Sequence, residues 1–370
     1  MRFKLLRLAG AVAAAIPLAV LLSSSTGAAP VANPLQRAAP PAVQPQGRVL
    51  LGLARAGNRL VAVGERGLVL LSDDHGLSWR QARVPVSVTL TAASFPAPRS
   101  GWAIGHAGTV LHSADGGETW ERQLDGNAVG QLLAAAAPHP AQAPEQAALA
   151  RQLIADGPDK PLLDVVFQDE RNGIVAGAYG LLLRTSDAGK TWTPLMSRVD
   201  NPKGLHWYAV RASGDSIWLA GEQGLLAHSA DGGKTFANVT APYRGTWFTL
   251  AALPDGGIVL GGLKGNAYRV AGAGGHFDRL DGYPAVSLSA SLVLADGRLL
   301  FANQAGQLFI AGARGQDARM VPQPFPAPLA ALAQAANGDV IVAGVRGVST
   351  IAMRALASPS SSTTASGATP

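Results

Sequence analysis

The sequence predicts an all-β fold built from repeated units, because two motifs recur along the chain with one shared spacing. The first has the pattern [ST]-x-D-x-G-x-[ST]-[WF] and occurs at Ser72–Trp79, Ser113–Trp120, Thr185–Trp192 and Ser229–Phe236. Each copy stands between two short apolar runs, as the turn of a β-hairpin does. Its carboxylate can accept hydrogen bonds from the backbone of its own turn, and its Gly can adopt a positive φ. The structural positions are Asp74 and Trp79, Asp115 and Trp120, Asp187 and Trp192, and Asp231 and Phe236.

The second motif is a G-x-x-G turn that precedes each hairpin. It begins at Gly64, Gly105, Gly177, Gly221, Gly262 and Gly344, with a variant copy at Asn303. Successive copies lie 41, 72, 44, 41, 41 and 41 residues apart, and the aromatic ends of the first motif keep the same steps as far as Phe277. Two features with one period indicate seven copies of a single structural unit.

Each unit is predicted to contain four strands, A to D. In the second unit they are Leu90–Phe95, Gly101–Ile104, Thr109–His112 and Thr119–Leu124. Four-stranded units repeated around an axis predict a seven-bladed β-propeller over residues 49–353, with the first motif at the C–D turns. That motif resembles the Asp-box, or BNR, repeat of β-propellers.

The later units depart from the pattern. The Asp of the motif is replaced by Gly272 and Ala313 in the fifth and sixth units, where Gly274 and Gly315 are expected to keep the turn. The seventh unit ends after its predicted strand C, Val348–Met353. We therefore expect the Pro- and Ala-rich segment 29–48 to close the ring, with Ala38–Pro45 as strand D of the seventh blade. Residues 354–370 are expected to be disordered.

The N-terminal residues 1–28 have the pattern of a secretory signal peptide. Three basic residues precede the apolar run Leu8–Leu22, and small residues follow it. A membrane anchor is the alternative, but a run of about 15 residues is shorter than the roughly 20 that a spanning helix needs. The pattern predicts export to the periplasm or another extracytoplasmic compartment. The chain has no Cys, so it has no disulfide framework.

The 72-residue step contains an insertion, residues 125–160, between the second and third units. Pro144 begins a predicted helix with a narrow apolar stripe that ends near Gly157, and Leu132–Ala137 is a candidate first helix. Such a helical hairpin either contributes to binding or only covers its own blade.

Blade topology predicts where binding occurs. The B–C turns and D-to-A connections emerge on one face, so the G-x-x-G turns and the insertion should share it. The candidate partner-binding residues are Arg66, His106, Tyr179, Gln223, Lys264 and Arg346. Their mixed charge suits a protein surface better than a phosphate, and the alternative is ordinary solvated turns. Trp207 and Trp247 either stack on a ligand or pack between blades.

The sequence gives no sign of an enzyme or of a cofactor. Charged residues are 15% of the chain, and three of the six net positive charges lie in the leader, so we predict no nucleic-acid partner. The His residues have no metal-ligand spacing, and His112 and His228 occupy one repeat position, which indicates a structural role. Neither a dinucleotide nor a phosphate fingerprint is present, and no paired carboxylates or Glu-activated Tyr of a sialidase or glycosidase are evident.

The segments GWAIGHAGTVLHSADGGETW (Gly101–Trp120) and GIVAGAYGLLLRTSDAGKTW (Gly173–Trp192) resemble the photosystem II stability/assembly factor family. The resemblance covers about Val49–Met353. It implies an exported, non-catalytic, monomeric propeller that binds a membrane-protein client, or a membrane transport complex, and aids its assembly. Family members bind through an Arg-rich patch, to which Arg66 and Arg346 correspond. The alternative function is that of a glycan-binding or sialidase-like BNR-repeat protein.

Overall fold

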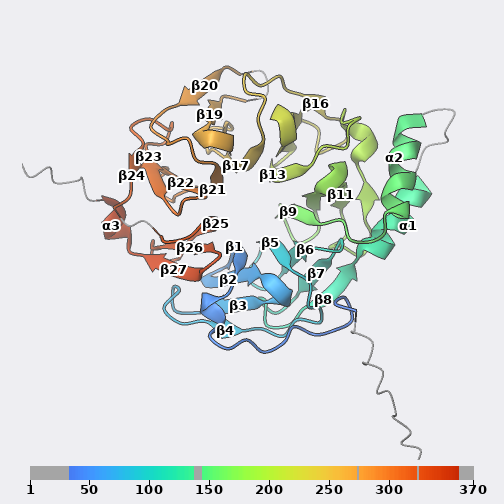
Figure 1. Ribbon diagram of the computed structural model, residues 1–370, viewed down its shortest axis with the longest axis horizontal. Coiled ribbons are helices and arrows are strands. Elements are labelled where there is room, and N and C mark those ends of the chain that lie inside the picture. The colour runs from blue at the N-terminus through green and yellow to red at the C-terminus, as the bar shows by residue number, and fades with distance from the viewer. Residues whose placement is uncertain (1–32, 137–143, 273–274, 323–324, 358–370) are drawn as a thin grey trace, which may run out of the picture. The chain divides into compact units, whose positions relative to one another are not determined.

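Seven antiparallel sheets stand around one axis in the computed structural model, which describes residues 33–136, 144–272, 275–322 and 325–357 (Figure 1). The innermost strands contact their neighbours in sequence, and the first contacts the last, so the ring is closed. The predicted seven-bladed propeller is confirmed. The predicted signal peptide, residues 1–28, lies outside the described residues.

The blades are numbered from the N-terminus. Blade 1 contains β1 (Leu50–Ala56), β2 (Arg59–Gly64), β3 (Val69–Ser72) and β4 (Arg80–Gln81). Blade 2 contains β5 (Leu90–Ser94), β6 (Gly101–Gly105), β7 (Val110–Ser113) and β8 (Glu121–Leu124). Blade 3 contains β9 (Leu162–Phe167), β10 (Gly173–Gly177), β11 (Leu182–Thr185) and β12 (Thr193–Pro194). Blade 4 contains β13 (Trp207–Ser213), β14 (Ser216–Gly221), β15 (Leu226–Ser229) and β16 (Ala237–Asn238).

The remaining blades follow the same order. Blade 5 contains β17 (Trp247–Ala252), β18 (Ile258–Gly262), β19 (Ala267–Val270) and β20 (Phe277–Leu280). Blade 6 contains β21 (Leu288–Val293), β22 (Leu299–Asn303), β23 (Leu308–Ala311) and β24 (Arg319–Met320). Blade 7 contains β25 (Leu329–Gln334), β26 (Val340–Gly344) and β27 (Gly347–Ile351). The α-helices are α1 (Gly126–Ala136), α2 (Pro144–Ala155) and α3 (Met353–Ala357), and the insertion is helical as predicted.

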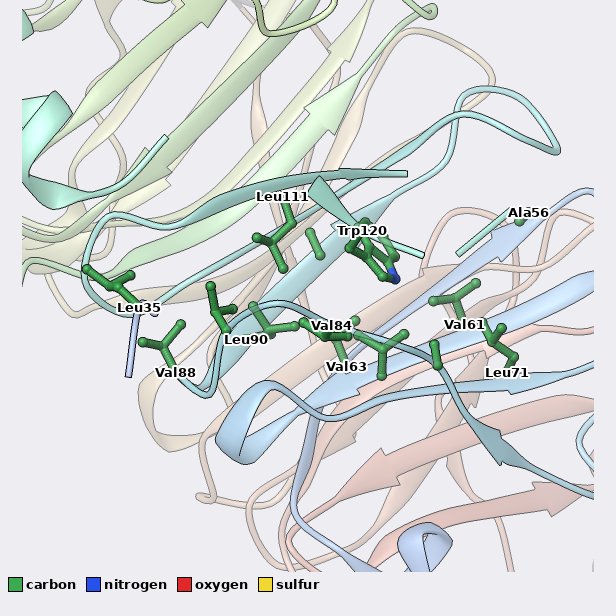
Figure 2. Packing of buried hydrophobic residues seen from close by; sticks show 14 residues of the cluster. Leu35, Ala56, Val61, Val63, Leu71, Val84, Val88, Leu90, Leu111 and Trp120 are labelled. Atoms are coloured by element: carbon green, nitrogen blue, oxygen red, sulfur yellow. The ribbon is translucent and has the colours of Figure 1, made fainter. Parts of the chain in front are cut away.

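The core lies in the seams between blades. Each sheet packs on both faces, which is why the second strands are mostly apolar and β6, β10 and β26 are buried along their whole length. In the seam between blades 1 and 2, Val61 and Leu71 of blade 1 meet Leu111 and Trp120 of blade 2 (Figure 2). The aromatic residue of each Asp box therefore joins its own blade to the preceding one.

The Asp boxes have the hydrogen bonding that their sequence predicts. In blade 2, Asp115 accepts bonds from the Thr119 backbone N–H at 3.0 Å, the Thr119 hydroxyl at 2.5 Å and the Ser113 hydroxyl at 2.8 Å. The Gly117 N–H donates to Ser113 Oγ, and the Trp120 indole N–H donates to the Gly117 carbonyl at 2.9 Å. Ser113 and Trp120 are both buried, so the box fastens the end of strand C to the seam.

These bonds keep the box carboxylates ionised. Bonds from the hydroxyl and backbone of Ser78 lower the pKa of Asp74 to about 2, and the same groups of Thr191 lower the pKa of Asp187 to about 2. The hydroxyl of Thr235 likewise lowers the pKa of Asp231. Burial opposes this for Asp115, but its hydrogen bonds outweigh burial and its pKa is still lowered.

The prediction that Ala38–Pro45 forms strand D of blade 7 is wrong. The sheet of blade 7 has three strands among the described residues, and the segment follows the outside of blade 1 instead. The Ala39 N–H donates to the Val84 carbonyl at 3.0 Å, and the Ala42 N–H donates to Gln81 Oε1 at 2.9 Å. Pro40 and Pro41 have no N–H for a strand ladder, which favours these isolated contacts. The short 3₁₀ helix η1 (Pro45–Gly47) packs against β27, and Ala42 lies in the apolar cluster that contains Val348 of β27.

Blade 7 is completed from its C-terminal side. Its chain turns into α3, where Leu356 is fully buried among blade 6 and blade 7 residues such as Ile310 and Val342. Box aromatics occupy the corresponding seams of blades 1 to 4, so Leu356 replaces an Asp-box aromatic. The predicted disorder from residue 354 is therefore wrong for 354–357, and residues 358–370 lie outside the described chain.

Two further sequence interpretations are resolved by burial. Trp207 and Trp247 are 1% and 0% exposed and pack between blades, so they are not stacking platforms for a ligand. His112 and His228 both lie against a Trp ring, at 4.6 and 4.4 Å between centroids, and face a Ser hydroxyl. The structural role predicted for this repeated His position is confirmed.

Candidate partner-binding face

The G-x-x-G turns are built by backbone contacts that repeat in all seven blades. The N–H of the second turn residue donates to the carbonyl of the residue just before strand A, as from Glu65 to Val49 at 3.1 Å and from Glu222 to His206 at 3.1 Å. A Cβ on the first Gly would meet that same carbonyl, at 2.1 Å for Gly64. The turns therefore lie over the starts of the innermost strands, and we call this side of the ring the G-x-x-G face.

The third turn residue adopts the left-handed conformation in five blades, although it is not Gly. These residues are Arg66, Ala107, Tyr179, Gln223 and Lys264, with φ between 53° and 56°. Because side chains other than Gly reach this region at a cost, the turns hold their third residue in a strained and fixed direction.

All six predicted partner-binding residues are exposed on this face. Four of them are the left-handed residues with large side chains, His106 stands at the second turn position, and Arg346 belongs to the turn of blade 7. The structure thus places all six on the rim of one face but at two turn positions.

Sequence reasoning missed Arg48, a further cation of this face. Arg48 precedes β1 and occupies the link between blade 7 and blade 1, where Gly347 closely approaches Gln46. Arg48, Arg66 and Arg346 are exposed around this junction, and none of them forms an ion pair with an acid of the described chain. Arg48 could have been found from its place just before strand A of blade 1, because the connections that enter the A strands emerge on this face.

The insertion begins and ends at this face, as predicted. The Gly126 N–H donates to the Ala107 carbonyl at 2.7 Å, and the Gly108 N–H donates to the Lys160 carbonyl at 2.8 Å. Lys160 Nζ then lies 5.6 Å from the centre of the Tyr179 ring. The ends of the insertion therefore join the turns of blades 2 and 3.

The two helices of the insertion cover the outer side of blades 2 and 3 (Figure 1). Val129, Leu133 and Leu153 are buried in the apolar cluster that contains Leu181 and Trp192 of blade 3. The hairpin thus covers the seam of its neighbouring blades, while its two ends contribute to the G-x-x-G face.

A second group of side chains, which sequence reasoning did not assemble, crosses blades 3 to 5 of this face. Tyr179, His206, Tyr208 and Phe248 follow one another with ring centroids 5.0, 6.2 and 5.3 Å apart. We call these four residues the aromatic strip. Glu222 fixes its centre, because one carboxylate oxygen lies 3.1 Å from His206 Nδ1 and accepts the His206 backbone N–H at 2.9 Å.

A hollow of about 390 Å³ lies on blade 4, where Leu205, the chain neighbour of His206, forms part of its lining. The connections before β13 and β17 form its walls, and Gln223 and Gly224 of the blade 4 turn form part of its lining. Its cations Lys203 and Arg244 are exposed and make no ion pair with a described acid. We call this feature the blade 4 hollow.

The face shows little catalytic chemistry. Burial, with a smaller contribution from the nearby Glu222 charge, raises the pKa of Tyr208, which is the reverse of what a tyrosine nucleophile needs. Within the described ranges, no group of three or more His, Asp or Glu residues is placed to hold a metal ion. No helix in that part of the chain is long and apolar enough to cross a membrane.

Fold and face together define an Asp-box β-propeller whose repeated turns present variable side chains on one side. The chain belongs to the photosynthesis system II assembly factor YCF48 family, whose model matches residues 56–134 and 144–280. It is 30% identical over 77 residues to the photosystem II assembly lipoprotein Ycf48 of Synechococcus sp. (strain CC9902), which is 21% of this chain and 23% of that protein. It is 28% identical over 102 residues to the chloroplastic photosystem II stability/assembly factor HCF136 of Oryza sativa subsp. japonica, 26% of this chain and 24% of that protein. Each match thus spans about a quarter of the relative's length.

Solved structures agree on the fold. A YCF48 bound to a D1 peptide has a TM-score of 0.61 at 15% identity, covering 82% of this chain and 93% of its own. YCF48 from Cyanidioschyzon merolae has a TM-score of 0.60 at 16% identity, covering 84% and 97%. The GH74 xyloglucanase of Xanthomonas campestris also matches, with a TM-score of 0.58 at 15% identity over 82% of this chain and 52% of that enzyme.

Proposed function

We propose that this protein is an exported, non-catalytic propeller that binds an extracytoplasmic segment of a membrane-protein client and aids its assembly or stability. The observation that carries the proposal is the set of exposed cations Arg48, Arg66 and Arg346 on the G-x-x-G face, none of which forms an ion pair with an acid among the described residues. Three such cations on adjacent blades favour a client segment that brings carboxylates to them.

The backbone of the turns supports the same face. A Gly at the third turn position would remove the left-handed strain, yet Arg66, Tyr179, Gln223 and Lys264 stand there with large exposed side chains. Strain that the fold does not require is a sign of function, so we assign partner contact to these side chains together with His106 and Arg346.

The relatives of this protein indicate the class of client. A YCF48 structure contains a D1 peptide, and the curated relatives are named as photosystem II assembly factors. We extend from them only the general role, which is recognition of a peptide segment of a membrane protein. The export pattern of residues 1–28 suits the same role, since one relative is named a lipoprotein and another chloroplastic.

The alternative is a glycan-acting propeller, favoured by the likeness to a GH74 xyloglucanase. That likeness concerns the fold, at 15% identity. The raised pKa of Tyr208 and the engagement of Glu222 by His206 oppose the tyrosine–glutamate chemistry of a sialidase-like site.

A pull-down from detergent-solubilised membranes tests the proposal. The bait is the mature protein, and the test variant is Arg66→Ala with Arg346→Ala. The matched control is Arg171→Ala with Arg314→Ala, which removes two exposed arginines from the opposite face. We expect the test variant to lose at least about tenfold of the captured membrane protein while the control retains it. Equal capture by both variants, or turnover of fluorogenic glycosides by the wild type, would overturn the proposal.

A further inference from the structure

We propose that the aromatic strip binds a large apolar side chain of an acidic, extended client segment and so determines which segments are accepted. The inference rests on the proposed client-binding function and names the part of the client that gives specificity. It concerns Tyr179, which is already a predicted partner-binding residue, together with His206, Tyr208 and Phe248, to which neither the sequence motifs nor the names of relatives assign a role.

The strip owes its position to a β-bulge present in every blade. The pairing of strands A and B skips one residue at the start of each strand A, as between Trp207 and Ala209 and between Trp247 and Thr249. The skipped residues form a ring at the G-x-x-G end of the innermost strands: Leu51, Thr91, Leu163, Tyr208, Phe248, Ser289 and Ala330.

What these bulge residues do differs around the ring. In blades 2 and 6 they serve the fold, because the Thr91 and Ser289 hydroxyls donate to the carbonyls of Leu162 and Leu329 in the next blade, at 2.8 and 2.6 Å. In blades 4 and 5 the same position holds Tyr208 and Phe248, whose rings pack edge to face and are only partly buried. Exposed aromatic area is thus concentrated on blades 3 to 5 of the face, where a binding partner gains most from covering it.

The centre of the strip is held by hydrogen bonds before any partner arrives. Glu222 accepts the His206 backbone N–H at 2.9 Å, and the Tyr179 backbone N–H donates to His206 Nδ1 at 3.5 Å. His206 is thereby held between Tyr179 and Tyr208, and the left-handed turn sets the backbone of Tyr179, which is 42% exposed. An ordered His206 reduces the side-chain entropy that is lost on binding, which favours a specific contact.

The charge beside the strip favours an acidic peptide as its occupant. Gln223 and Gly224, which follow Glu222 in its turn, line the blade 4 hollow together with Lys203 and Arg244. These two cations outnumber Asp200, the acid in that lining. A segment with a carboxylate next to a large apolar residue can place one in the hollow and the other on the strip. Both interactions then involve blade 4 and a single extended stretch of the peptide backbone.

The ring geometry disfavours a sugar on the strip. Adjacent rings are inclined by 46°, 28° and 73°, so the strip is stepped and offers no continuous flat platform over its length. A stepped apolar surface suits a branched or aromatic side chain that packs between rings.

The test uses capped synthetic peptides of alternating Glu and Gly with one central Phe, Leu or Ser, titrated calorimetrically into the mature protein. We expect the Phe peptide to bind at least about tenfold more tightly than the Ser peptide, because one buried aromatic contact contributes that much. Tyr208→Ala with Phe248→Ala should bring the two affinities together and leave binding of the Ser peptide within about threefold of wild type. Lys203→Ala with Arg244→Ala should weaken both peptides alike, because the hollow receives the carboxylate that both peptides share.

A second variant guards against a folding defect. Tyr179→Ser changes a half-exposed side chain and should reduce the Phe-to-Ser ratio partially, with an unchanged melting temperature. A wild-type protein that binds both peptides equally would overturn this inference and leave the proposed function standing. A wild type that binds neither peptide contradicts both, and strip-dependent binding of xyloglucan oligosaccharides would assign the strip to a glycan instead.

Discussion

The two faces of the ring use their side chains in opposite ways. On the Asp-box face, which contains the A–B and C–D turns, polar side chains hold the turns and join neighbouring blades. Arg59 and Arg80 both bind Asp73 of blade 1 and Glu118 of blade 2, at 2.5 to 3.2 Å. On the G-x-x-G face, the turns are held by backbone hydrogen bonds, and cations such as Arg66 have no acidic partner in the described chain.

The contrast explains which residues repeat along the chain. The Asp-box face needs its side chains for the fold, so the same residue types recur from blade to blade. The G-x-x-G face needs only its glycines and backbone, so its intervening positions are free to vary and to bind. The following experiments test that division, beginning with the largest expected effect.

Trp120→Ala should give the largest loss of stability. Trp120 is 5% exposed, packs edge to face with Phe95 and donates its indole N–H to Gly117. Truncation of a buried aromatic costs about 3–5 kcal/mol. Tyr179→Ala, a truncation on the other face, should change the unfolding free energy by less than about 0.5 kcal/mol. Urea unfolding of both variants decides the matter, and equal losses would contradict the division between faces.

A smaller effect is expected inside one turn of the G-x-x-G face. Gly67 has φ of 76°, and a Cβ there would lie 2.1 Å from the Val86 carbonyl, so Gly67→Ala should cost about 1–3 kcal/mol. Its neighbour Arg66 has φ of 54° and is exposed. Arg66→Gly removes that strain but increases the conformational entropy of the unfolded chain. The free energy of unfolding should therefore stay within about 1 kcal/mol of wild type. An equal decrease in melting temperature for both variants would show that the Arg66 side chain also supports the turn.

The fold was largely predictable from the sequence because its determinants are local and repeated. An Asp box needs only eight consecutive residues, and the bonds of Asp115 to Ser113 and Thr119 are those that its spacing predicts. The repeats also allowed the blades to be counted and the insertion to be located, since each repeat marks one blade.

Ring closure was not predictable in this way because it occurs once and joins distant parts of the chain. Leu356 lies in no sequence pattern that marks it as the counterpart of an Asp-box aromatic residue. The Pro-rich segment likewise belongs to no repeat that would place it beside blade 1. The aromatic strip was missed for the same reason. Tyr208 and Phe248 lie in different blades, and only the bulge at the start of each strand A turns them toward one another.

The smallest expected effect is a loss of stability in acid. The pKa of Asp74 and Asp187 is about 2 in the folded protein, below the ordinary value of 3.8, so the unfolded chain binds more protons as the pH falls from about 4 to about 2. Stability must therefore decrease through that window. Burial also lowers the pKa of His112 and His228, so a first, shallower loss should begin below about pH 6.5.

Asp187→Asn isolates the contribution of one box. The amide cannot be protonated in this range and accepts fewer hydrogen bonds from Thr191, so the variant should melt lower at pH 7 but lose less on further acidification below pH 4. Melting temperatures from pH 7 to pH 2 for both proteins provide the measurement. A parallel decline of the two curves below pH 4 would mean that the box carboxylate does not couple folding to protons, and that the Asp-box face is held by packing alone.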